Sequence, residues 1–261
     1  MGILNVTPDS FSDGGEFLST DAALGHAEKL IREGVDIIDI GGESTRPGSQ
    51  VVSIEDEIAR VVPVIEAITK KFETPISVDT SKSEVAERAI DAGAEIINDI
   101  SGLRFDPRIA DIAASLKAGL VLMHSRGSFE TMHGQETVED IFSEVKGDLH
   151  RAIESARCRG VSDGQIALDI GIGFSKTPEQ NLELLAKLGK IVAEFKGYPM
   201  LVGTSRKSFI GKILGDVSPA ERLSGSLATA IFTVIKGAKI IRVHDVRETV
   251  NAVRVISAIP K

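Results

Sequence analysis

The 261-residue sequence lacks the cysteines, apolar runs and leader that would place a protein outside the cell or in a membrane. Its one cysteine, Cys158, cannot form an internal disulfide, and no Cys/His spacing typical of a metal site occurs. No apolar run reaches the roughly 18 residues that span a bilayer. The start of the chain turns polar at Asn5, unlike a signal peptide. We therefore expect a cytoplasmic protein without a membrane segment.

The sequence also lacks an excess of positive charge. Lys and Arg number 30 against 38 Asp and Glu, which gives a net charge of −8 and no basic stripe. This charge distribution argues against nucleic acid as the main partner. It still allows a locally positive pocket for a small anion. The nucleophile elbow of serine hydrolases, the HExxH zinc motif and a glycine-rich phosphate loop are all missing.

What the sequence does contain is a regular alternation of short apolar runs and helical patterns. The predicted strands are 2–6, 37–41, 76–79, 96–99, 120–123, 166–170, 200–203 and 240–243. The predicted helices are 21–33, 54–72, 82–92, 108–115, 138–159, 178–194, 219–236 and 246–258. Such alternation predicts a parallel sheet, and at this length a single-domain (β/α)8 TIM barrel of the α/β class over residues 1–261. A doubly wound open sheet is the alternative, but its glycine fingerprint is absent after the first strand.

Several helix boundaries have a local cause. Apolar residues at 54, 58, 61, 65 and 68 form one helix face, and Pro63 within it predicts a kink. Thr177 and Ser218 each begin a capping box followed by proline, and Ser81 offers a similar start. Glycines 34, 93, 160 and 237 are placed to end helices in the left-handed conformation.

Polar residues gather at the carboxyl ends of the predicted strands. The stretch 37–49 shows this best, because a β-branched run breaks at Gly41-Gly42 into a polar loop that ends in Pro-Gly. In a barrel these ends form one rim, where active sites lie. Carboxylates and amides there suit a polar heterocycle, while Arg, Lys and His suit phosphate oxygens. The inventory favours a reaction with a charged leaving group over covalent catalysis, since Cys158 lies inside a predicted helix.

Motifs along the whole chain resemble those of the dihydropteroate synthase family. They are Gly2-Ile-Leu-Asn-Val-Thr-Pro-Asp-Ser-Phe-Ser-Asp-Gly-Gly15, Asp39-Ile-Gly-Gly-Glu-Ser-Thr-Arg-Pro-Gly48, Ser77-Val-Asp-Thr80, Ile97-Asn-Asp-Ile-Ser-Gly102, Leu122-Met-His124, Asp169-Ile-Gly-Ile-Gly-Phe174, Ser205-Arg-Lys-Ser208 and Arg242-Val-His-Asp245. The resemblance implies a (β/α)8 barrel that joins 6-hydroxymethyl-7,8-dihydropterin diphosphate to p-aminobenzoate, with Mg²⁺ as cofactor and release of pyrophosphate.

The resemblance also implies roles for individual residues. The pterin would be held by Asp79, Asn98, Met123, Asp169, Lys207 and Arg242, of which Asp79, Lys207 and Arg242 are the expected catalytic residues. The diphosphate would meet Asn5, Thr45, Arg46, Arg242 and His244, with Asn5 also a Mg²⁺ ligand. The p-aminobenzoate site would comprise Phe11, Thr45, Pro47, Phe174, Lys207 and Ser208. Diphosphate would leave before the amine attacks, and Asp79 would offset the charge of the resulting cation.

Some features stay open at this stage. Ile170 and Ser175 stand where the family commonly has proline and glycine, which puts local loop rigidity in doubt. Asp39 lies before the strand tip. It is either a buried polar residue beneath the site or an indirect partner of the metal, and we favour the buried polar residue. The small residues of 224–231 suit a homodimer contact or packing on the barrel equally. A non-catalytic pterin-binding paralogue and a methyltetrahydrofolate-dependent methyltransferase are the alternative functions.

Overall fold

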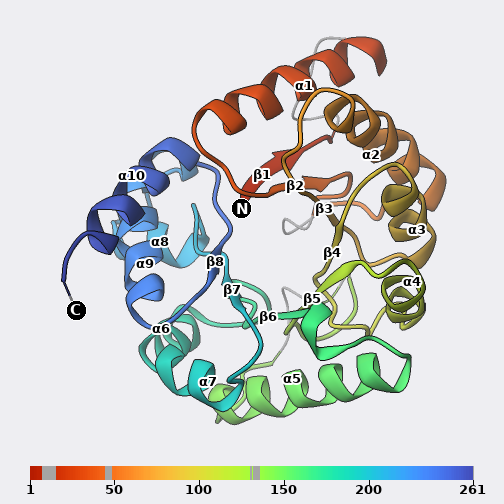
Figure 1. Cartoon of the computed structure of the whole chain (residues 1–261). Coiled ribbons are helices and arrows are strands. Elements are labelled where there is room, and N and C mark those ends of the chain that lie inside the picture. Colours follow the sequence, from red (N-terminus) through yellow and green to blue (C-terminus); the bar gives the residue numbers. More distant parts are fainter. Residues whose placement is uncertain (8–15, 45–48, 130, 132–135, 261) are drawn as a thin grey trace.

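The computed structural model describes residues 1–7, 16–44, 49–129, 131 and 136–260, and within them the predicted barrel is present (Figure 1). Eight parallel strands pair in chain order. They are β1 (Gly2–Asn5), β2 (Ile38–Gly41), β3 (Ile76–Asp79), β4 (Ile96–Asp99), β5 (Gly119–Met123), β6 (Ile166–Asp169), β7 (Met200–Val202) and β8 (Ile240–Ile241). A parallel bridge between Gly2 and Val243 closes the sheet, which excludes the open doubly wound alternative.

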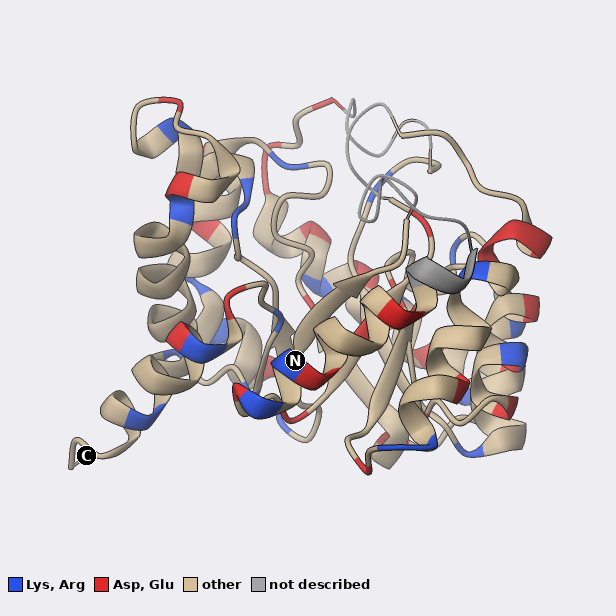
Figure 2. Cartoon of the chain, turned by 90° about the horizontal axis from the view of Figure 1, so that it is seen from above, with Lys and Arg blue, Asp and Glu red and all other residues tan. Residues whose placement is uncertain are grey.

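Helices surround the strands as an outer ring (Figure 1). They are α1 (Glu16–Arg32), α2 (Ile54–Thr69), α3 (Ser83–Asp91), α4 (Arg108–Leu116), α5 (Ile141–Cys158), α6 (Pro178–Ala186), α7 (Leu188–Glu194), α8 (Ser208–Ile213), α9 (Leu223–Ile235) and α10 (Val246–Ser257), with short 3₁₀ turns η2 (Asp163–Gln165) and η3 (Pro219–Arg222). None of the described helices is long and apolar enough to cross a membrane. The helices drawn in Figure 2 carry acidic and basic residues side by side.

Helix α2 shows how the apolar stripe orients a helix on the barrel. Val61, Ile65 and Ile68 are fully buried, as the spacing predicts. Ser53 caps the start, because its hydroxyl accepts a hydrogen bond from the amide of Asp56 at 3.0 Å. The helix continues through Pro63 as one unbroken element.

The capping predictions had mixed outcomes. The Thr177 and Ser218 capping boxes are present, the second opening the 3₁₀ turn η3. The Ser81 start is wrong, since α3 begins at Ser83 and its N-cap residue, Lys82, makes no side-chain cap. Instead the Ser83 amide donates to Asp106 Oδ2 at 3.0 Å, so a tertiary contact replaces the local cap. Glycines 34, 93, 160 and 237 all have positive φ, as predicted.

Three details of the helix pattern differ from the prediction. The single helix expected at 178–194 is divided at Lys187 into α6 and α7. The helix expected at 219–236 begins with η3 and becomes α9 only at Leu223. Helix α8 was not predicted, because six residues carry too little periodicity to be recognised.

The barrel interior changes from apolar to polar along its axis. Val121, Ala167 and Leu201 form one buried apolar cluster together with Met1. Side chains two residues apart in a strand point to the same face, so Met123 and Asp169 follow Val121 and Ala167 toward the carboxyl end. Parallel strands thereby direct their last side chains into one opening at that end.

Candidate active site

Strands β1 to β4 bring an amide, a carboxylate and a second amide together at this opening. Their register places Asn5 beside Gly41, Gly41 beside Asp79, and Asp79 beside Asn98. A Cβ atom built on Gly41 would lie 3.7 Å from Asn5 Oδ1 and 3.6 Å from Asp79 Cβ. The missing side chain therefore leaves Asn5 and Asp79 facing a shared space.

Arg242, just after β8, links two carboxylates that come from β2 and β3. Its Nε donates to Asp39 Oδ2 at 2.5 Å, and its Nη2 donates to Asp79 Oδ2 at 2.6 Å. Asn98 Nδ2 also donates to Asp39 Oδ2, at 3.1 Å. Asp39 is fully buried, whereas the Arg242 side chain is 21% exposed. Four strands thus share one network whose cation reaches the opening.

The charge state of Asp79 follows from this network. Burial raises the pKa of Asp79 from 3.8 to about 7, the neighbouring Arg242 opposes the rise, and the Asp39 carboxylate adds to it. Near neutral pH the Asp79 carboxyl is therefore close to its midpoint. It can donate or accept a hydrogen bond with little free-energy cost for the change of protonation.

Asp169 adds another carboxylate at the end of β6. It lies beside Leu201 of β7 and next to Met123 of β5 in the register. Its Oδ1 accepts a hydrogen bond from the amide of Gly171 at 2.7 Å, which fixes the carboxylate plane. Burial raises the pKa of Asp169, while the nearby Lys207 opposes the rise.

An apolar wall lies next to these polar groups. Ile100, Met123 and Phe174 form a buried cluster. Lys207 Nζ lies 4.2 Å from the centre of the Phe174 ring, a cation–π contact. Burial, assisted by Arg242, lowers the pKa of Lys207 to about 8. The opening thus offers a flat apolar surface, a carboxylate edge and a cation, the combination that a polar aromatic ring requires.

His244 is held at the same end by Ser205. The Ser205 hydroxyl accepts a hydrogen bond from the His244 amide at 3.2 Å and lies 3.0 Å from His244 Nδ1. Since the hydroxyl is then free to donate to Nδ1, we assign the remaining proton of the ring to Nε2. Burial, with Arg242 nearby, lowers the pKa of His244 to about 4, so the neutral ring presents an N–H donor at neutral pH.

Comparison with known proteins agrees with this geometry. The family model described as "Pterin binding enzyme" matches residues 1–244. The Escherichia coli (strain K12) dihydropteroate synthase is 50% identical over 260 residues, covering 99% of this chain and 90% of that protein. The chain belongs to the pterin-binding enzyme family.

Solved members of the family share the whole fold. The Clostridium difficile dihydropteroate synthase, solved in the presence of pteroic acid, has a TM-score of 0.93 and 44% identity, covering 99% of this chain and 95% of that one. The Xanthomonas albilineans enzyme in complex with 7,8-dihydropteroate has a TM-score of 0.88 and 40% identity, covering 100% and 94%. The barrel and the site therefore lie within one family architecture.

The residues predicted for pterin binding are brought together at the opening. Asn5, Phe174 and His244 lie there as well, and Ser208 is exposed at the first turn of α8. Four residues of the prediction, Phe11, Thr45, Arg46 and Pro47, lie outside the described residues. Their roles stay predictions.

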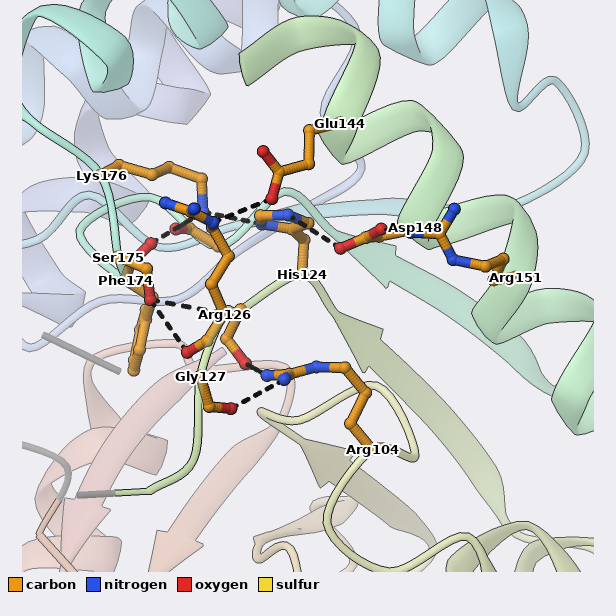
Figure 3. Close-up of polar contacts among 12 residues, drawn as sticks. Arg104, His124, Arg126, Gly127, Glu144, Asp148, Arg151, Phe174, Ser175 and Lys176 are labelled. Atoms are coloured by element: carbon orange, nitrogen blue, oxygen red, sulfur yellow. Dashed lines mark hydrogen bonds and ion pairs between the residues drawn. The ribbon is translucent and has the colours of Figure 1, made fainter. Parts of the chain in front are cut away.

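A second polar cluster, which the sequence did not single out, lies behind Phe174 (Figure 3). Lys176 Nζ donates to the carbonyl oxygens of Gly171 and Phe174 at 2.7 and 2.9 Å and lies 2.9 Å from His124 Nδ1. Burial lowers the pKa of Lys176 to about 7. The lysine thus ties the loop that follows β6 to the end of β5, and this loop carries Phe174.

The departure at Ser175 belongs to the same cluster. Ser175 has a φ of 53°, a left-handed conformation that is costly for any residue except glycine. Its hydroxyl compensates by accepting from the Arg126 amide at 3.3 Å and donating to the Arg126 carbonyl at 3.2 Å. Two hydrogen bonds between neighbouring loops therefore offset the conformational cost of having serine at this position in place of glycine.

This cluster also contains the one described group of residues that could hold a metal ion. Ligand atoms of His124, Glu144 and Asp148 lie within 4.8 Å of one another. Arg126 Nε is 2.8 Å from Glu144, Arg151 pairs with Asp148, and Lys176 contacts His124. These cations already neutralise both acids, and Mg²⁺ prefers an all-oxygen shell. We therefore assign the cluster to loop packing.

Proposed function

We propose that this chain is a dihydropteroate synthase, which forms 7,8-dihydropteroate and pyrophosphate from 6-hydroxymethyl-7,8-dihydropterin diphosphate and p-aminobenzoate. The observation that carries the proposal is the linked network of Asp39, Asp79, Asn98 and Arg242 at the barrel opening. It combines acceptors for a heterocycle with a cation for an anion. Relatives that are 47% and 50% identical to this chain are dihydropteroate synthases, which supports the proposal.

The pterin ring would lie deep in the opening. Asp169 can accept two parallel hydrogen bonds from an amino group and a ring N–H. Asn98 and Asp79 lie on β4 and β3 of the same barrel. The apolar cluster of Met123, Phe174 and Ile100 supplies a surface for the ring face. Lys207 and Arg242 would lie between the ring and the diphosphate.

The diphosphate would occupy the outer part, where donors and cations are available. The Nε2–H of His244 and the free N–H groups of Arg242 suit phosphate oxygens. The p-aminobenzoate ring would then lie near Phe174 and Lys207, with Ser208 at its carboxylate. Thr45, Arg46, Pro47 and Phe11 complete this proposal from the sequence resemblance.

We propose Mg²⁺ as the cofactor. The amide oxygen of Asn5 is a hard donor of the type that Mg²⁺ accepts, and it lies 3.7 Å from the position that a Cβ atom on Gly41 would take. One protein ligand suffices for a site completed by substrate phosphates and water. Bound there, the ion would neutralise negative charge on the departing diphosphate.

The reaction is a displacement at the pterin methylene. The carbon–oxygen bond to the diphosphate breaks with its electron pair leaving on pyrophosphate, and the arylamine nitrogen forms the new carbon–nitrogen bond and loses a proton. Arg242 would stabilise the negative charge that develops on the leaving group. Asp79 and Asp169 lie where they can offset positive charge on the ring, so no strong base is needed for the weakly basic amine.

The first prediction concerns turnover by the purified protein. Pyrophosphate release should require both substrates and Mg²⁺, should stop with excess EDTA, and should recover when Mg²⁺ is restored. Stoichiometric 7,8-dihydropteroate, followed by chromatography, is the second readout. Binding of the pterin diphosphate without release would identify a non-catalytic pterin-binding protein. Methyl transfer from methyltetrahydrofolate without coupling would identify the methyltransferase alternative.

We further propose that the chain forms a homodimer through α9 and α10. Of the small residues at 224–231, Ser226 and Ala230 are buried, whereas Ser224 and Ala228 are exposed on α9 and available to a partner. Large apolar side chains of the two helices are exposed as well: Phe232, Ile235 and Val255 are 40%, 63% and 68% exposed. Light scattering should give twice the chain mass of 27.8 kDa, and Ile235→Lys should lower it to one chain. A wild-type monomer would contradict the proposal.

A further inference from the structure

Asp39 lies inside β2, two residues before the strand tip at Gly41. It is 0% exposed, so the carboxylate sits below the level at which a ligand enters. One of its oxygens, Oδ2, accepts from both Arg242 Nε at 2.5 Å and Asn98 Nδ2 at 3.1 Å. The other, Oδ1, is buried and has no hydrogen-bond partner among the described residues. Burying a carboxylate costs free energy unless hydrogen-bond and ion-pair partners compensate for the loss of water.

We propose that Asp39 is a positioning residue for the pterin: it orients the Arg242 guanidinium and the Asn98 amide that bind the ring, without touching the ring itself. This inference rests on the proposed function and assigns a role to a residue that the sequence left open.

The geometry at Arg242 explains how one carboxylate sets a direction. A guanidinium has five N–H donors in a fixed plane. Nε faces Asp39 in β2 and Nη2 faces Asp79 in β3, so contacts from two strands define the plane. Its outer end, formed by Nη1 and the second N–H of Nη2, is thereby directed toward the opening. Without Asp39, only the single contact to Asp79 would hold the plane.

The geometry at Asn98 is equally directional. An ionised carboxylate is only an acceptor, so the side of the amide that faces Asp39 must be the NH₂ group. The Asn98 carbonyl oxygen therefore points away from Asp39, where it can accept a hydrogen bond from the pterin. A neutral replacement for Asp39 could donate as well as accept, and the amide would lose this fixed orientation.

The test compares Asp39→Asn with Ser77→Ala. Ser77 is the register neighbour of Asp39 in β3, and its buried hydroxyl has no hydrogen-bond partner in the described residues, which makes it a matched control inside the same barrel layer. Asp39→Asn should raise the KM for the pterin diphosphate by about ten- to hundredfold, the effect of losing one hydrogen bond to a charged group. The KM for p-aminobenzoate should stay within about twofold. Ser77→Ala should leave both values unchanged.

Equilibrium binding separates this inference from the proposed function. Quenching of the fluorescence of 6-hydroxymethylpterin reports ring binding without turnover, so Asp39→Asn should weaken it even if the coupling assay on the wild type fails. Asp39→Ser, which removes the charge and leaves room for water, gives a second neutral variant if the asparagine does not fold. Unchanged pterin affinity in a folded variant would overturn the proposal. Equal loss for both substrates, in proportion to lost folded protein, would also overturn it and leave Asp39 a purely structural ion-pair partner.

Discussion

Asp79→Asn should remove most of the turnover, by about a hundredfold or more, while the barrel stays folded. Asparagine keeps an oxygen that can accept from Arg242 Nη2, so the network retains its shape. What disappears is the negative charge beside the proposed cationic pterin, and a misplaced or missing charge of this kind typically costs two to three orders of magnitude. Steady-state kinetics with circular dichroism as the folding control measure this. A folded variant with a rate within threefold of the wild type would rule out the electrostatic role of Asp79.

The same variant should change how stability depends on pH. Because burial raises the pKa of Asp79 from 3.8 to about 7, the folded state binds more protons than the unfolded state between these values. The contribution of Asp79 to stability is therefore full below pH 3.8 and is lost as the pH rises toward 7. Relative to Asp79→Asn, the wild type should lose free energy of unfolding across that window and show no further change above it. Urea denaturation at intervals from pH 4 to 8 tests the sign.

Arg242→Met should be the most destabilising change in the site. Methionine preserves much of the apolar stem but leaves the Asp39 and Asp79 carboxylates without their shared cation. Removing one partner of a buried ion pair costs about 3–5 kcal/mol, and turnover should fall below detection. The urea midpoint measures the stability change. The double variant Arg242→Met, Asp39→Asn should recover part of the loss, because one of the stranded charges is removed.

Arg206→Met provides a matched control for this measurement. Arg206 follows β7 as Arg242 follows β8, and it pairs with one carboxylate, Asp245, but its side chain is 36% exposed. Partly exposed ion pairs contribute at most about 1 kcal/mol. An Arg242 variant that is no less stable than the Arg206 variant would show that the buried network does not hold the barrel together.

Sequence periodicity was sufficient for the architecture. The stretch 37–41, with isoleucine at 37, 38 and 40, favours a strand buried on both faces, and its pattern is local information. Capping boxes at Thr177 and Ser218 are equally local, and both were found where they were predicted. The Ser81 cap failed because Asp106, 23 residues from Ser83, satisfies the Ser83 amide instead.

The site residues likewise fall into those that sequence could propose and those that only the folded structure reveals. Strand-tip residues such as Asp79, Asp169 and Lys207 could be proposed from sequence, because parallel strands bring their carboxyl ends to one opening whatever lies between them. For Asp39 the sequence favoured a buried polar residue, and its full burial agrees with that. Its partner could not be named from sequence, since the contact with Arg242 joins residues 203 positions apart and depends on closure of the barrel. Lys176 was missed for a related reason: only the folded loop after β6 places its amine against His124, the residue that follows β5. Sequence by itself determined the barrel and its polar rim, whereas tertiary structure decided which buried charges meet, because burial and pairing are properties of the closed sheet.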